Sequence, residues 1–144
     1  MNKDVLSNKV IIFNESDKNR LPQKKVNNII KLVLDDNNIN NATINVIYCD
    51  DNYIHKINVE YLKHDYPTDI ITFTIEDEPL LCELYISIDT AQKNADFYKV
   101  TLSNELLRLA AHGALHIVGY NDSDDISRDI MKSKEDYYLQ KIVG

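Results

Sequence analysis

The sequence predicts a single domain, residues 1–144, of the α/β (α+β) class, with helices packed on a small, mixed four-stranded sheet. Three observations support this fold class. A chain of 144 residues has the usual length of one domain. Four short segments have the apolar, β-branched or alternating pattern of strands. The segments between and after them have the spacing of helices, and strands interleaved with helices are typical of this class.

The four expected strands are residues 10–13, 43–48, 70–75 and 81–87. The first is a short apolar run, and the second alternates between apolar and polar side chains. The third and fourth flank the acidic segment 76–79, which reads as a turn. Because so short a link joins them, they are expected to form an antiparallel hairpin.

The first three expected helices lie between and just after the strands. One begins at Pro22, where proline in the first turn loses no hydrogen bond, and runs to about Asp36. Asp50 is expected to cap the second, because an aspartate oxygen can accept a hydrogen bond from the first turn. Asp89 is expected to cap a short third helix.

Two further helices complete the chain. Ser103 is expected to cap the fourth, which runs through Val118 and stops at Gly119, the residue type that commonly follows a helix C-terminus. Asp124 or Asp125 opens the fifth.

Composition narrows the range of functions. Residues 1–64 carry nine basic and eight acidic side chains, and residues 65–144 carry seven and fifteen, which gives a net charge of −7. An acidic chain argues against broad nucleic-acid binding, which usually needs a basic face.

Cys49 and Cys82 belong to no CxxC pattern and are expected to be buried thiols. No segment suits a signal peptide or the roughly 20 apolar residues of a membrane span, so we expect a soluble, cytoplasmic protein.

The fourth helix carries the most informative motif. His112 and His116 are four residues apart, Gly119 follows, and Asp122 comes three residues later. Histidines at i and i+4 point the same way and can share one metal ion. A glycine can turn the chain back and bring Asp122 to the open side of the two rings. Three protein ligands with a position left for water are typical of catalytic zinc.

The same helix has a polar stripe on an otherwise apolar surface. Glu105, Arg108, His112 and His116 fall within roughly 80° of one another at about 100° per residue. A buried helix must direct such groups at partners, a cavity or an ion, because unpaired buried polar groups are costly. The alternative is that both histidines are ordinary core residues and that the Asp-rich segment 121–125 only caps a helix.

Gly113 argues against ordinary peptidase chemistry. Zinc peptidases with the HExxH motif place a glutamate directly after the first histidine, as the general base. That position is Gly113 here, which leaves the metal site intact but removes the base.

Three segments resemble the YbeY endoribonucleases, which are rRNA maturation factors. They are His112-Gly-Ala-Leu-His116-Ile-Val-Gly119-Tyr120, residues 58–73 with their Pro67-Thr68-Asp69 sequence, and Glu83-Leu-Tyr-Ile86-Ser87. The resemblance implies a single α/β domain with a zincin-like metal site on a core helix. It also implies a zinc-dependent endoribonuclease that is specific for single strands, matures the 3′ end of small-subunit (16S) rRNA and acts in ribosome quality control. Its partners would be single-stranded RNA and the small ribosomal subunit.

The chain departs from this family at three positions. Asp122 stands where a third histidine is usual, and a carboxylate can ligate zinc at about the same distance. Leu62 stands where the family usually has an arginine thought to hold phosphate. Cys82-Glu83 replaces a usual Gly-Asp pair.

The leading hypothesis is hydrolysis of an RNA phosphodiester with one zinc ion held by His112, His116 and Asp122. Asp69 and His64 are the candidate general bases. Arg108 either binds phosphate or pairs with Glu105. Two alternatives stay open: a metal-dependent hydrolase of another substrate, such as a peptide, and a non-catalytic ribosome assembly factor with a structural metal. A monomer is the default.

Aromatic residues form one further candidate group. Stacking on RNA bases is one role open to these rings, and a position in the core or at its rim is the simpler interpretation. The residues are Tyr61, Tyr66, Phe73, Tyr85 and Tyr120.

Overall fold

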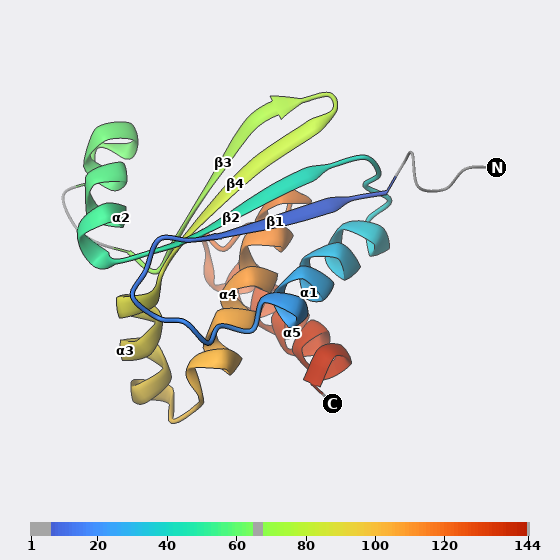
Figure 1. Ribbon diagram of the computed structural model, residues 1–144. Helices are drawn as coiled ribbons and strands as arrows, with labels where there is room; N and C mark the ends of the chain where they lie inside the picture. The colour runs from blue at the N-terminus through green and yellow to red at the C-terminus, as the bar shows by residue number, and fades with distance from the viewer. Residues whose placement is uncertain (1–6, 65–67, 144) are drawn as a thin grey trace.

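A mixed sheet lies over a layer of helices in the computed structural model, which describes residues 7–64 and 68–143 (Figure 1). The sheet order is β1-β2-β4-β3. Neighbours β1, β2 and β4 pair in parallel, and β3 pairs with β4 antiparallel. This confirms the expected hairpin and leaves β3 at an edge. The strands are β1 (Lys9–Asn14), β2 (Thr43–Cys49), β3 (Ile70–Asp77) and β4 (Leu80–Ser87).

The described residues form five α-helices and one π-helical turn, each where a helical pattern is expected. They are α1 (Gln23–Asp36), α2 (Asp51–Ile57), η2 (Asn58–Leu62), α3 (Ile88–Tyr98), α4 (Leu102–Ile117) and α5 (Asp125–Val143). The expected fold class is therefore confirmed. Helices α1, α4 and α5 pack against one another under the sheet. Among the described helices, none is long and apolar enough to cross a membrane. Tyr66 and Pro67 lie outside the described residues.

The helix termini follow side-chain hydrogen bonds. Asp50 caps α2 by accepting from the backbone N–H of Tyr53 at 2.8 Å, as expected. The expected cap Asp89 is wrong, because strand β4 leads directly into α3 and Ser87 is the first residue outside the helix. The expected cap Ser103 is also wrong, since Thr101 accepts the N–H of Asn104 at 3.0 Å and α4 begins one residue earlier than Ser103.

Two further caps surround the loop after α4. Asp124 accepts the N–H of Ser127 at 2.7 Å, which makes Asp124 the cap of α5. At the other end of the loop, the N–H groups of Gly119 and Tyr120 donate to the carbonyls of His116 and Leu115. This is the Schellman arrangement, and Gly119 accommodates it with a φ of 110°. The turn directs the chain back toward the histidines.

Helix α4 is the centre of the core. Nearly all of its apolar side chains are buried, among them Leu106, Leu107 and Leu115. It comes close to the sheet at Gly113, where an added Cβ would lie 2.9 Å from Ile70 Cδ1 and 3.0 Å from Leu84 Cδ2. A side chain at position 113 would therefore crowd Ile70 and Leu84, and these two side chains would have to shift to admit it.

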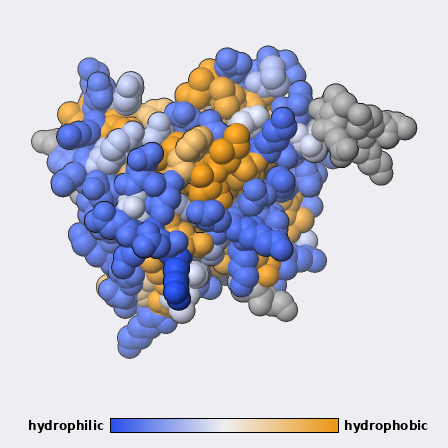
Figure 2. Space-filling view, in the orientation of Figure 1, coloured by the Kyte–Doolittle hydropathy of each residue, from blue (hydrophilic) through white to orange (hydrophobic). Residues whose placement is uncertain are grey.

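The opposite face of the sheet is only partly covered. Helix α2 packs its buried Ile54 and Ile57 against Cys49 and Ile71 at one end of this face. Further along, Ile11, Phe13 and Ile75 are 44–51% exposed. The space-filling view shows apolar side chains gathered over the strands and surrounded by hydrophilic ones (Figure 2).

The two cysteines are buried free thiols, as expected. Cys49 lies on the α2 side of the sheet, where burial and the nearby carboxylates raise the pKa of its thiol to about 12. Cys82 lies in the main core.

Substitution of Gly113 tests the close contact between α4 and the sheet. We expect Gly113→Val to lower the free energy of unfolding by about 1–3 kcal/mol, because overpacking a core costs this much. Gly113→Ala should lower the free energy of unfolding by less, since alanine favours a helix over glycine by about 1 kcal/mol. Urea unfolding followed by circular dichroism measures both. Ser103→Val, on an exposed position of the same helix, is the control, and wild-type stability of Gly113→Val would contradict the packing.

Candidate metal centre

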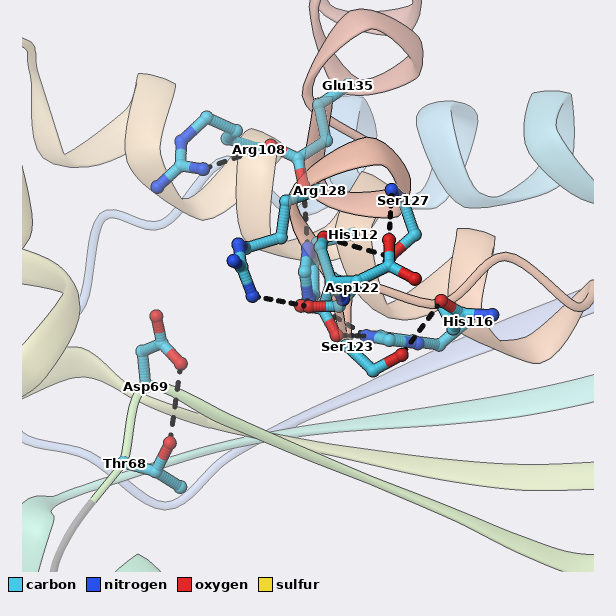
Figure 3. A network of polar contacts seen from close by, with 12 residues as sticks. Thr68, Asp69, Arg108, His112, His116, Asp122, Ser123, Ser127, Arg128 and Glu135 are labelled. Atoms are coloured by element: carbon cyan, nitrogen blue, oxygen red, sulfur yellow. Dashed lines mark hydrogen bonds and ion pairs between the residues drawn. The ribbon is translucent and has the colours of Figure 1, made fainter. Parts of the chain in front are cut away.

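Two histidines and one aspartate converge at the C-terminal end of α4 (Figure 3). His112 Nε2 and His116 Nε2 are 3.0 Å apart. Asp122, from the loop after Gly119, places Oδ2 3.4 Å from His112 Nε2 and Oδ1 3.5 Å from His116 Nε2. The structure thus brings together all three residues of the expected ligand set.

These separations fit one bound ion. An ion that holds three such atoms at about 2.0–2.2 Å in a tetrahedron separates them by roughly 3.3–3.6 Å. One ligand atom from each of the three residues lies within 4.8 Å of the other two, so small side-chain shifts let the three share one ion. Two imidazoles and a carboxylate are also a donor set that zinc accepts. Among the described residues, the group contains no fourth histidine, cysteine or carboxylate, so a fourth position is left for water or substrate.

Neighbouring carboxylates have other partners and do not compete with Asp122. Asp124 caps α5 through Ser127. Asp125 forms an ion pair with Arg128. The Asp-rich segment is therefore both a helix cap and the source of a candidate ligand.

Glu135 orients His112 and was missed by the sequence analysis. Its Oε2 lies 2.6 Å from His112 Nδ1, and its side chain is only 3% exposed. Since a carboxylate only accepts hydrogen bonds, Nδ1 carries the proton and the lone pair of Nε2 faces the other ligands. Such carboxylate–histidine pairs orient metal ligands and raise their basicity. The signal in the sequence was a glutamate between Met131 and Tyr138 on the buried face of α5.

Arg108 joins Glu135 to a second buried carboxylate. Its Nη1 donates to Glu135 at 3.0 Å, and its Nη2 and Nε donate to Glu105 at 2.6 and 3.0 Å. Burial lowers the pKa of Arg108, but the two carboxylates outweigh this and raise it. The expected alternative, pairing with Glu105, is therefore present, and direct phosphate binding by Arg108 stays a prediction.

Asn94 of α3 links this network to Asp69, the residue that precedes β3. Its side-chain amide lies 3.3 Å from both Glu105 Oε2 and Asp69 Oδ2. Glu105, Arg108 and His112 of the polar stripe thus have partners on α3 and α5, as a buried helix requires. The same contacts place Asp69 in a fixed position next to β3.

A cavity of about 590 Å³ opens beside the three ligands. Asp69 and His64, the two candidate bases, line it together with His112, His116 and Asp122. Leu62 also lines it, at the position where the resemblance leads one to expect an arginine. Arg108 is absent from this lining and lines a second cavity of about 450 Å³, whose wall also includes His112 and Asp122. The fold therefore brings Asp69 and His64 to one cavity of the metal centre and Arg108 to another.

Comparison with known proteins gives one consistent result. The family model described as Endoribonuclease YbeY matches residues 11–143. A protein of that name from Chloroherpeton thalassium is 40% identical over 130 residues, which cover 90% of this chain and 92% of the relative. Another from Flavobacterium johnsoniae is 46% identical over 99 residues, covering 67% and 70%. The solution structure of TM1509 from Thermotoga maritima is similar, with a TM-score of 0.66, 26% identity, and coverage of 92% of this chain and 88% of that one.

The pKa of His112 tests its orientation by Glu135. Burial lowers this pKa, but the hydrogen bond and charge of Glu135, together with Asp122 and Asp69, outweigh burial and raise it. In metal-free protein we therefore expect an NMR titration of His112 above about 6.5, the ordinary value. Glu135→Gln should lower this pKa, since burial then acts with less opposition. Asp129→Asn, at an exposed position of α5, should leave it unchanged, and an unmoved pKa in Glu135→Gln would refute the pairing.

Substitution of Asp122 tests the third ligand. We expect Asp122→Ala to weaken zinc binding at least tenfold, because two histidines then hold the ion alone. Asp122→His should bind zinc, since imidazole ligates at a similar distance. Competition with a zinc-binding dye at pH 7.5 measures the affinities, with Asp124→Asn and Asp125→Asn as controls. Tight binding by Asp122→Ala would remove Asp122 from the ligand set.

Proposed function

Because the chain belongs to the YbeY endoribonuclease family, we propose that it is a metal-dependent hydrolase that cleaves single-stranded RNA. The observation that carries this proposal is a ligand set of three residues that faces an open cavity. Structural zinc sites are closed by four protein ligands, whereas catalytic sites keep one position open. The geometry therefore favours catalysis over the alternative of an assembly factor with a structural metal.

Zinc is the metal that we propose for this centre. His112, His116 and Asp122 would hold it, and an ion there supplies Lewis acidity to a water molecule and a phosphoryl oxygen. Glu135 keeps His112 in the tautomer that ligates. Arg108 fixes Glu135 in turn, so we assign Arg108 a positioning role beside its predicted contact with phosphate.

Asp69 is our first choice for the general base. Its carboxylate lies in the cavity wall and is held by Asn94 at 3.3 Å, and Thr68 Oγ1 lies 3.5 Å from its other oxygen. A positioned carboxylate can accept a proton from an attacking water. His64 lines the same cavity and is the second candidate.

The substrate assignment rests on the family resemblance. We propose maturation of the 3′ end of small-subunit (16S) rRNA and a part in ribosome quality control, in the cytoplasm and in contact with the small ribosomal subunit. The names of the relatives support an RNA substrate.

Peptide hydrolysis is a second candidate, favoured by one observation. Strand β3 pairs only with β4 among the described strands, and residues 70–72 of β3 line the cavity. A free strand edge beside a metal centre can pair with an extended peptide. The glycine at position 113 weighs against it, because it stands where zinc peptidases of the HExxH type have their glutamate base.

Substitution of His116 tests whether the metal centre cleaves RNA. We expect purified protein to contain about one zinc ion per chain and to cleave a labelled single-stranded RNA. His116→Ala should lose both the metal and the cleavage, because it removes a ligand from the centre. Gel analysis of RNA fragments, with Phe97→Ala as a distant surface control, measures activity. Full cleavage by His116→Ala would reject the proposal, and chelator-sensitive cleavage of a peptide library without RNA cleavage would favour the second candidate.

A further inference from the structure

Four aromatic rings form a continuous row on the face of the sheet opposite α4. Tyr61 and Phe73 have ring centroids 5.8 Å apart, Phe73 and Tyr85 are 5.9 Å apart, and Tyr85 and Tyr53 are 6.2 Å apart. The row runs from η2 across β3 and β4 to α2. We call it the aromatic row.

The two ends of the aromatic row are exposed to solvent. Tyr61 is 64% exposed and Tyr53 is 45% exposed, while Phe73 and Tyr85 between them are half-buried. The hydroxyl of Tyr85 donates to Glu83 at 2.9 Å, which fixes that ring. Rings that only filled the core would be covered at both ends, whereas these keep surface free for a ligand.

The aromatic row begins where the cavity of the metal centre ends. Leu62, the residue after Tyr61, lines that cavity, as do Thr72 and Thr74 on either side of Phe73. Successive residues of a strand point to opposite faces, so β3 presents threonines to the cavity and Phe73 to the aromatic row. The two surfaces adjoin along β3, and η2 contributes Leu62 to the cavity and Tyr61 to the aromatic row.

We propose that the aromatic row is a base-stacking platform for the single-stranded RNA next to the scissile bond. Aromatic rings bind single strands without sequence preference because every base has a face that can stack. Such a contact suits a chain with a net charge of −7, because stacking does not depend on positive charge. The proposal rests on the proposed function and names the binding surface that function requires.

Binding without cleavage tests this proposal. The full-length chain, with EDTA present, is titrated into a fluorescein-labelled single-stranded oligouridine, and anisotropy gives the Kd. We expect Tyr61→Ala to raise the Kd about tenfold or more, because it removes one stacked base. Tyr61→Phe should stay within twofold of wild type, since the ring and not the hydroxyl stacks.

Three controls make the outcome specific. Phe97→Ala removes a ring that is 78% exposed on α3, away from the aromatic row, and should leave the Kd unchanged. The loss in Tyr61→Ala should persist at high salt, because stacking, unlike phosphate contacts, releases no counterions. An abasic strand of equal length should bind wild type and Tyr61→Ala alike. Thermal melting of each variant checks that the fold is intact.

The results separate this proposal from the proposed function. Unchanged RNA binding in a folded Tyr61→Ala variant overturns the platform, even if wild type cleaves RNA once zinc is restored. Wild type that binds RNA through Tyr61 but never cleaves it with zinc supports the aromatic row as a surface that binds single-stranded RNA and overturns the nuclease. Absence of RNA binding by wild type overturns the platform.

Discussion

The rest of the structure depends on how α4 satisfies its polar side chains inside the core. The apolar residues of α4 are almost all buried. The same helix carries Glu105, Arg108, His112 and His116 on one polar stripe. Each would be costly if left without a partner. The fold meets this constraint by placing Glu135 and Asn94 from the flanking helices beside the stripe. The contacts that satisfy the buried polar groups of α4 are therefore the same contacts that orient His112 in the candidate metal centre.

The hydrogen bonds that satisfy this constraint also position the side chains of the candidate centre. His112 is held from behind by Glu135, and Glu135 is held by Arg108. The Schellman turn around Gly119 returns the chain, and the cap at Asp124 fixes the other end of the loop that carries Asp122. A centre built this way loses little conformational entropy when it binds a ligand, which is the advantage of preorganisation.

Much of the fold could be predicted because its signals are local. Strand and helix periodicity gave the order of the elements, and the short link before β4 gave the hairpin. The errors at Asp89 and Ser103 were shifts of two residues, which arose because Ser87 and Thr101 are also good caps. In the candidate site, the i, i+4 histidines and the glycine turn were enough to predict the three residues that converge.

The sequence by itself determined the family of the chain and the three residues of the candidate ligand set, because the three residues lie in one short segment whose geometry is set by one helix and one turn. Only the tertiary structure decided that Arg108 joins Glu105 to Glu135, that Asp69 and His64 share the cavity, and that Tyr61 begins an aromatic row. Glu135 is 23 residues from His112, and Asp69 is 25 residues from Asn94. Contacts over such separations depend on how helices and strands pack, and local periodicity carries no information about that packing.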